Sequence, residues 1–169
     1  ERYYRDNRLN PIHEGTNGIQ ALDLLGRKLT LAGGSVLREL FEAVQATADT
    51  AGPELNEFAN GLRQASQQVQ TTVERLLACL RQDPNLALAN ASVFLDLFGH
   101  WVIGWMWLRQ ATLAQRALPA ASGEDKAFYQ GKIFACQYFF RHELPKLRAW
   151  SELLCALDDT TLRLPVEAL

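Results

Sequence analysis

The sequence predicts an all-α fold, an up-down bundle of about four long helices preceded by a loop and one further helix. Apolar residues recur at spacings of three and four over long stretches, which is the period of a buried helix face. No stretch of useful length alternates apolar with polar residues, so strands are not expected. Short breaks between four long helices favour an antiparallel, up-down arrangement.

The helix before the bundle begins at Thr16 or Asn17. Either side chain can cap a helix, because a short oxygen-bearing side chain accepts a hydrogen bond from an otherwise unpaired backbone N–H. Its predicted apolar stripe consists of Ile19, Leu22, Leu25 and Leu29. We expect this helix to end at Gly33 and Gly34, because glycine readily adopts the left-handed conformation that ends helices.

The four bundle helices follow, separated by glycine, proline and capping residues. Their predicted ranges are 35–51, 53–82, 86–117 and 123–157. Asp83 or Asn85 can cap the third of them and Ser122 the fourth. Pro145 falls inside the last range, where it removes a backbone donor, so we expect a kink near Arg141 or His142. The residues after 157 are expected to be a frayed tail.

Composition limits the partners of this chain. Seventeen Lys and Arg stand against nineteen Asp and Glu, for a formal charge of −2. No basic block could neutralise a run of phosphates, so no nucleic acid is expected to bind. The three cysteines are far apart and lack the spacing of a zinc site or a disulfide framework, which favours reduced thiols and a cytoplasmic location. The apolar run 93–108 is short for a membrane span and carries Asp96 and His100, so a buried bundle helix fits it better and membrane association is not indicated.

A carboxylate stands beside a glycine on the loop before the first helix. Arg5 and Asp6 lead into the run Ile12-His13-Glu14-Gly15-Thr16-Asn17-Gly18-Ile19-Gln20. This run resembles the Arg-Asp…Glu-Gly-Thr-x-x-Ile-Gln segment near the carboxyl end of the flavin-dependent acyl-CoA dehydrogenases. Its longer form, continuing Ala-Leu-Asp-Leu, resembles the branch with a long C-terminal extension, which includes the methylmercaptopropionyl-CoA dehydrogenase type.

The resemblance implies a role for each residue of the motif. Glu14 would be the base that removes the α-proton of an acyl-CoA while the hydride passes to FAD. A carboxylate in a water-poor pocket suits this task, since burial raises its pKa toward the working pH. Gly15 would let the backbone approach the acyl chain, and Thr16, Asn17 and Gly18 would contact the flavin nucleotide. His13 stands where many relatives have tyrosine, which leaves the acyl chain length open.

Other residues have structural interpretations that outweigh functional ones. His100 lies in an apolar helix and is more often a hydrogen-bonded core residue than a ligand, with Asp96 as the expected partner. The pair His142-Glu143 has no second pair of metal ligands and is assigned to the Pro145 kink. The aromatic residues of the last helix are predicted to pack in the core rather than to line an acyl pocket: Phe128, Tyr129, Phe134, Tyr138, Phe139 and Phe140.

The resemblance divides the chain into residues 1–34, the end of the acyl-CoA dehydrogenase C-terminal domain, and residues 35–169, a helical extension. It implies a longer enzyme with FAD, an acyl-CoA substrate, an electron-transferring flavoprotein as partner and homo-oligomeric assembly. By itself this chain is expected to bind no FAD and to be inactive. The alternative function is a non-catalytic interaction or dimerisation module that stabilises the enzyme or covers its active site.

Overall fold

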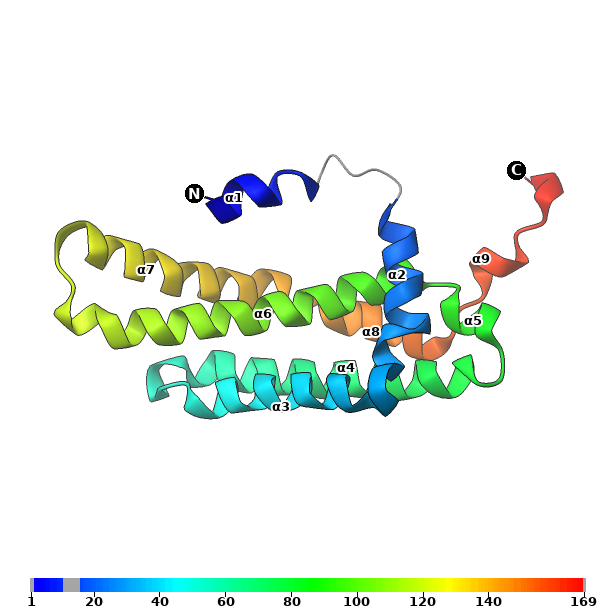
Figure 1. Ribbon diagram of the computed structural model, residues 1–169, viewed down its shortest axis with the longest axis horizontal. Coiled ribbons are helices and arrows are strands. Elements are labelled where there is room, and N and C mark those ends of the chain that lie inside the picture. The colour runs from blue at the N-terminus through cyan, green and yellow to red at the C-terminus, as the bar shows by residue number, and fades with distance from the viewer. Residues whose placement is uncertain (1, 11–15, 169) are drawn as a thin grey trace.

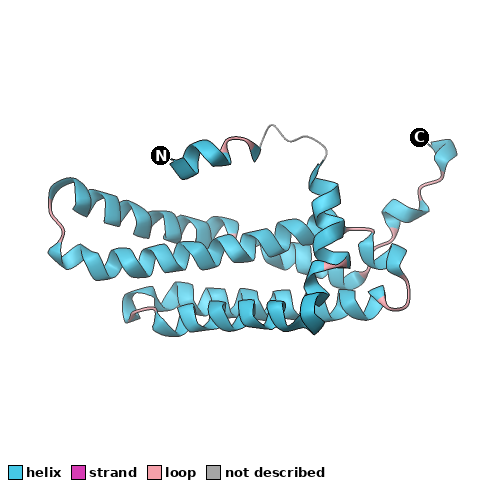
Figure 2. Cartoon of the chain, viewed as in Figure 1, coloured by secondary structure: helices cyan, strands magenta, loops and turns pink. Residues whose placement is uncertain are grey.

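The computed structural model describes residues 2–10 and 16–168, and all regular structure in these residues is helical (Figure 2). A short helix without buried residues, α1 (Arg2–Asn7), comes first. Four long rods then run back and forth side by side (Figure 1): α3 (Ser35–Thr50), α4 (Asn56–Leu80), α6 (Ala91–Ala117), and α7 (Gly123–Tyr138) continued by α8 (Lys146–Ala156). The predicted all-α bundle is confirmed.

The helix before the bundle, α2 (Thr16–Gly26), crosses one end of the rods at a steep angle (Figure 1). Its α-helical part ends at Gly26, earlier than predicted, and a 3-10 segment, Lys28–Gly34, follows. Ala32, Gly33 and Gly34 have positive φ angles of 49°, 66° and 85°. Three successive left-handed residues redirect the chain into α3, and glycine adopts this conformation without the Cβ penalty. The glycine pair therefore marks the turn, as expected, but not the end of the regular helix.

The predicted helix over 86–117 is two helices, α5 (Pro84–Leu88) and α6. Asp83 caps α5 as predicted, since its carboxylate accepts a hydrogen bond of 3.0 Å from the Leu86 backbone N–H. The break falls at Ala89 and Asn90. The Asn90 side-chain amide donates to the Asp158 carbonyl oxygen at 2.8 Å, which joins this break to the segment after α8.

Pro145 interrupts the last rod in the manner expected. The segment Phe139–Glu143 forms a π-helical turn between α7 and α8, and the Leu144 N–H donates to the Phe139 carbonyl oxygen at 2.8 Å. The wider turn accommodates a ring that has no N–H to donate. Leu157, with a positive φ of 53°, ends α8, and only the short elements α9 (Thr160–Arg163) and Val166–Ala168 follow.

The bundle has a single hydrophobic core, with α6 at its centre. Phe94, Leu97, Trp101 and Leu108 of α6 are fully buried against the surrounding helices. The Trp101 indole N–H donates to the Ser66 hydroxyl of α4 at 2.9 Å, so the buried polar atom is satisfied. By length and composition alone α6 could cross a membrane, but the central helix of a helical bundle meets the same criterion.

Candidate functional site

The candidate site begins at the amino-terminal turn of α2. Thr16, the first residue of α2, is partly buried, whereas Asn17 and Gly18 are exposed. A Cβ atom added at Gly18 would meet no neighbour within 4 Å. Glu14 and Gly15, the predicted base and acyl-chain contact, lie outside the described residues. In the described part of the motif, the first turn of α2 is therefore exposed to solvent at Asn17 and Gly18.

The inner face of α2 is part of the bundle core. Ala21 and Leu25 are completely buried and Leu29 is 3% exposed. Ala21 and Leu25 are four residues apart and lie on one face of α2, which packs on α6. Leu29 lies beyond the end of α2, in the 3-10 segment. The predicted stripe was wrong at Ile19 and Leu22, which are 65% and 48% exposed. Ala21, a smaller residue, is buried on this helix instead.

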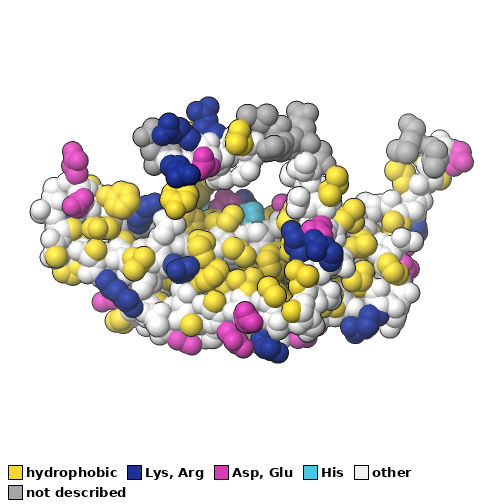
Figure 3. Space-filling model, viewed as in Figure 1, with side chains coloured by type: hydrophobic (Ala, Val, Ile, Leu, Met, Phe, Trp, Pro, Cys, Tyr) yellow, Lys and Arg dark blue, Asp and Glu magenta, His cyan; other side chains and the backbone are white. Residues whose placement is uncertain are grey.

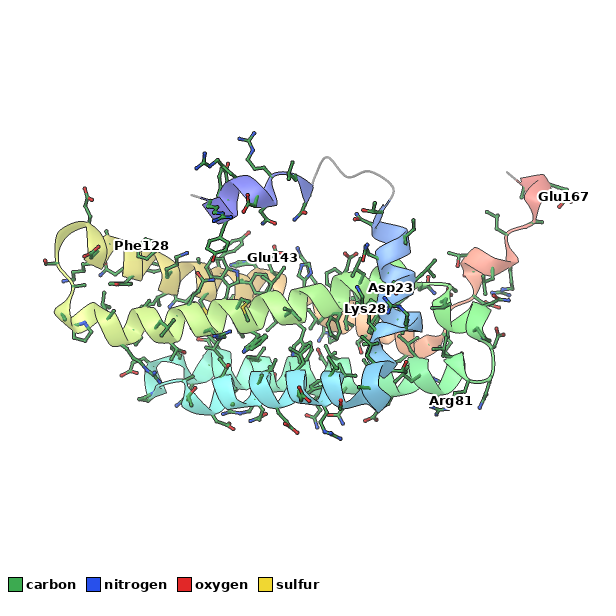
Figure 4. The ribbon with its side chains drawn as sticks, in the orientation of Figure 1. Asp23, Lys28, Arg81, Phe128, Glu143 and Glu167 are labelled. Atoms are coloured by element: carbon green, nitrogen blue, oxygen red, sulfur yellow. The ribbon has the colours of Figure 1, made fainter. Side chains whose placement is uncertain are left out.

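Three charged side chains interact with one another, one on α2 and two just after its end. The Asp23 carboxylate accepts from the Arg27 guanidinium at 2.6 Å and pairs with the Lys28 ammonium at 3.1 Å (Figure 4). Hydrogen bonding to Arg27, and then to Lys28, lowers the pKa of Asp23. The carboxylate is therefore ionised at neutral pH, and its charge is compensated by two cations beside it.

These features make the start of α2 compatible with an anionic cofactor group. The first turn carries no acidic residue, and a helix N-terminus offers unpaired N–H groups and a positive dipole end to phosphate. The exposed Asn17 and Gly18 therefore leave room for an anionic group to approach this turn. A complete binding site for such a group would need residues other than those of this turn.

The described bundle has several hollows, among them one with an apolar lining and one of larger volume. An apolar hollow of about 310 Å³ lies where the 3-10 segment meets α3 and α6. Figure 3 shows hydrophobic side chains gathered on this face of the bundle. Its lining consists of Leu24, Lys28, Leu29, Leu31, Val36, Leu37, Leu40 and Phe98. A groove of about 620 Å³ lies between α3 and α4. The first is at the lower limit of ligand pockets, and its one charged side chain already pairs with Asp23.

His100 is a hydrogen-bonded bundle residue, as predicted, but its acidic neighbour is different. Its Nδ1 lies 3.0 Å from the Asp96 carbonyl oxygen and therefore donates to it. Its Nε2 faces the Glu143 carboxylate of the π-helical turn at 3.6 Å. Lys146, and also His100, lower the pKa of Glu143. His100 thus links α6 to the kink, while the Asp96 side chain takes no part.

The six aromatic residues of the last rod that were predicted to pack in the core differ in burial, and Tyr129 is partly buried. Phe139 and Phe140, at the π-helical turn, are buried as predicted. The core prediction was wrong for Phe128, Phe134 and Tyr138, which are 59%, 67% and 60% exposed. These three rings lie on α7 and face solvent in the described part of the chain.

Residues 2–10 and 16–168 contain no group of three His, Cys, Asp or Glu side chains that could hold a metal ion. The three cysteines are free thiols, and burial raises the pKa of Cys136 to about 12. A thiol with so high a pKa stays protonated and is a poor nucleophile at neutral pH.

Comparison with known proteins identifies the class to which this bundle belongs. Residues 40–165 match the family described as acetyl-CoA dehydrogenase C-terminal like, and the chain belongs to that family. The family predicted from the sequence is thereby confirmed.

Individual relatives are acyl-CoA dehydrogenases. The chain is 35% identical to 3-methylmercaptopropionyl-CoA dehydrogenase of Ruegeria pomeroyi over 95% of its length, which is 28% of that protein. It is 30% identical to the broad-specificity linear acyl-CoA dehydrogenase FadE5 of Mycobacterium tuberculosis, over 97% of this chain and 28% of the relative. A butyryl-CoA dehydrogenase of Syntrophomonas wolfei is 26% identical. The chain thus spans about 28% of the curated relatives that it matches.

Two features of the site region escaped prediction from the sequence. Ala21 reads as an unremarkable small residue between Ile19 and Leu22, although its lack of bulk was the available signal for close helix packing. The contact between His100 and Glu143 joins residues far apart in the chain. Helical spacing carries no information about such a pair.

Proposed function

We propose that this chain is the C-terminal part of a flavin-dependent acyl-CoA dehydrogenase, which forms an α,β double bond in an acyl-CoA thioester. One observation carries the proposal: the Glu14-Gly15-Thr16 motif leads directly into α2, whose inner face belongs to the core of a bundle of the acyl-CoA dehydrogenase C-terminal family. The names of three relatives support the same reaction class.

In this proposal Glu14 acts as the base. Its carboxylate removes a proton from the carbon next to the thioester carbonyl, and the Glu14 backbone N–H donates to the carbonyl oxygen as negative charge develops there. A fixed donor at that oxygen lowers the barrier to proton loss. Gly15 has no Cβ and so lets the backbone approach the acyl chain. Bound FAD supplies the acceptor for the hydride that leaves the β-carbon.

The start of α2 holds the nucleotide end of the cofactor in this proposal. Thr16, Asn17 and Gly18 contribute N–H groups and an uncrowded surface to it. The inner face of α2 keeps the helix on the bundle, so the residues of the motif before Thr16 are joined to a fixed point. The resemblance further implies that the enzyme passes its electrons to an electron-transferring flavoprotein.

The test uses the full-length protein that contains this chain. Glu14→Gln retains the shape of the side chain but removes the base, so desaturation should fall by about 10²–10⁴-fold while flavin stays bound. Glu39→Gln is a matched control, because Glu39 is an exposed carboxylate on α3. Undiminished turnover of Glu14→Gln would remove Glu14 as the base.

The 169-residue chain alone gives a second test. It contains one edge of the proposed site, so we expect it to bind no flavin and to oxidise no acyl-CoA. Flavin recovered with it in stoichiometric amount would contradict this expectation, and absorbance of the purified chain near the flavin bands is sufficient to measure it.

A further inference from the structure

The π-helical turn between α7 and α8 packs closely on both neighbouring helices. We call Phe139–Glu143 the π turn. Phe140 lies over Gly61 of α4, where an added Cβ atom would be 3.2 Å from its ring. Leu144, the next residue after the π turn, lies over Gly104 of α6, where an added Cβ atom would be 3.1 Å from its methyl group. Neither glycine has a positive φ angle, so their lack of a Cβ serves this close approach rather than a turn of the backbone.

The helix before the π turn has less burial of its own than the helix after it. Cys136 is the one residue of α7 that is buried in the described chain. α8 buries Leu147 and Leu154, and its Ser151 hydroxyl lies 2.7 Å from the Thr72 hydroxyl of α4. The position of α7 therefore depends more strongly than that of α8 on the contacts that hold the π turn.

His100 of α6 contacts the π turn through a ring whose orientation is fixed. Its Nδ1 lies 3.0 Å from the Asp96 carbonyl oxygen, and its Nε2 lies 3.6 Å from a carboxylate oxygen of Glu143, which is labelled in Figure 4. The imidazole stacks on Phe139 with ring centroids 6.0 Å apart and meets the Trp150 ring edge-on at 4.7 Å. These two rings hold the plane of the imidazole, so its nitrogens keep their directions.

Both nitrogens of His100 face groups that accept hydrogen bonds. A carbonyl oxygen can only accept, so Nδ1 carries a proton. Hydrogen bonding to Lys146 lowers the pKa of Glu143, whose carboxylate is therefore ionised at neutral pH and also only accepts. A neutral imidazole with its proton on Nδ1 turns the lone pair of Nε2 toward this anion, whereas an imidazolium turns an N–H toward it. The surroundings of His100 thus match the charged form of the ring.

The other charged groups at the π turn already have partners. The Lys146 ammonium lies 2.5 Å from the same Glu143 oxygen that faces His100, so two cations share one carboxylate. On the α4 side of the π turn, the Arg141 guanidinium donates to the Glu57 carboxylate at 2.8 Å and 2.9 Å. Because Glu143 keeps Lys146 as its partner when His100 is neutral, loss of the imidazolium weakens the contact with α6 without leaving an unpaired carboxylate.

We propose that His100 is a charge-dependent latch, which holds the π turn and thereby α7 on α6 as an imidazolium and releases this contact as a neutral imidazole. The contact needs a charged His100 and an ionised Glu143. It is therefore present in mildly acidic solution, above the lowered pKa of Glu143, and is lost as pH rises through the range in which imidazoles lose their charge, about pH 5 to 8. This inference concerns the bundle and holds whether or not Glu14 is a catalytic base.

The test is hydrogen exchange of the 169-residue chain at several values of pH. Protection factors correct for the intrinsic dependence of exchange on pH, so they report how firmly each segment is held. As pH rises, protection of the amides of residues 139–147 and of α7 should fall by about two- to fivefold, the effect of a partly exposed ion pair, while protection in α3 stays constant. The fall should coincide with the shift of the His100 ring signals in NMR spectra.

Four variants separate the latch from general stability. His100→Gln cannot change its charge and should make protection of the π turn independent of pH. Glu143→Gln removes the acceptor and should have the same effect, which keeps the test available if His100→Gln does not fold.

His142→Gln is the matched control, because His142 belongs to the same π turn but stacks on Tyr138, with ring centroids 4.7 Å apart; it should retain the fall in protection. Lys146→Gln removes the competing cation and should enlarge the fall. An equal fall in the unmodified chain and in His100→Gln, or constant protection while the NMR signals show His100 losing its charge, would overturn the proposal.

Discussion

The anchoring of α2 can be tested by shortening one side chain. Leu25 is completely buried on the inner face of α2, one turn after the buried Ala21 and next to the end of the helix at Gly26. Leu25→Ala would leave a cavity where α2 packs on α6. The exposed Ile19 on the same helix gives a matched control, because Ile19→Ala also removes aliphatic atoms but from a side chain that is 65% exposed.

The expected magnitude follows from burial. Truncation of a fully buried leucine costs about 2–5 kcal/mol, the sum of the lost transfer free energy and the cavity left behind. We expect Leu25→Ala to lower the free energy of unfolding by about 3 kcal/mol. Ile19→Ala should change it by no more than about 0.5 kcal/mol, as is usual for surface substitutions.

Urea unfolding followed by far-UV circular dichroism measures both changes, and hydrogen exchange locates them. If α2 unfolds together with the bundle, Leu25→Ala reduces the protection of core amides in α2 and α6 alike, by about a hundredfold for 3 kcal/mol. If the loss is confined to α2, this helix is a separate cooperative unit, which would support the predicted domain boundary after Gly34.

The reasoning fails if Leu25→Ala and Ile19→Ala have equal effects. That result would mean that the inner face of α2 contributes nothing to the bundle core. The proposal that the bundle fixes the start of the Glu14 loop would then lose its physical basis.

Three further predictions concern hydrogen bonding, pH and reactivity. Ser66→Ala leaves the buried Trp101 N–H unpaired and should lower the free energy of unfolding, measured with urea, by about 1–3 kcal/mol. Hydrogen bonding to Arg141 lowers the pKa of Glu57 below its ordinary 4.5, so the pair stabilises the fold above that pH and is lost as pH falls through the lower folded-state value; Glu57→Gln should therefore flatten the acid limb of the melting temperature. Burial raises the pKa of Cys136 to about 12, so it should resist a thiol reagent near neutral pH until the chain unfolds.

Each of these has an internal control. Trp105 donates to Thr47 at 2.7 Å but is only partly buried, so water can replace the hydroxyl and Thr47→Val should cost less than Ser66→Ala. Equal costs would contradict the role assigned to burial. An acid limb unchanged by Glu57→Gln would show that the Arg141 pair has no influence on folding. Cys155 is partly exposed and should react first; equal rates at Cys136 and Cys155 would contradict the burial argument.

The long helices were predictable because their signals are local. A buried face repeats every three or four residues, and Asp83 and Pro145 act on the backbone beside them. The break at Asn90 was not predictable, because the Asn90 side chain bonds to Asp158, a residue of the last segment of the chain. The sequence pattern around Asn90 therefore contains no information about this distant partner.

The buried face of α2 could not be predicted from the local sequence pattern either. Ile19 and Leu22 fit a helical stripe with Leu25 as well as Ala21 does, so spacing alone leaves two interpretations. The larger side chains favoured the wrong one, since burial was inferred from hydrophobicity. Close approach to α6 favours the small residue, and only the packed structure distinguishes these cases.

The candidate site divides in a similar way. The Glu14-Gly15-Thr16 motif and its likeness to acyl-CoA dehydrogenases are properties of consecutive residues, and the family match agrees with them. The open terminus of α2 and the charge compensation of Asp23 needed the structure. The assignments of Glu14, Gly15, Thr16, Asn17 and Gly18 remain predictions for the full-length protein.

The sequence by itself determined the all-α class, the number of long rods, the kink at Pro145 and the family, because each depends on the order of neighbouring residues. The tertiary structure decided which faces are covered. It buried Ala21 rather than Ile19 and left Phe134 and Tyr138 on the surface. The physical reason is that periodicity shows only that a helix has an apolar face, whereas burial depends on whether another element, or another molecule, packs against it.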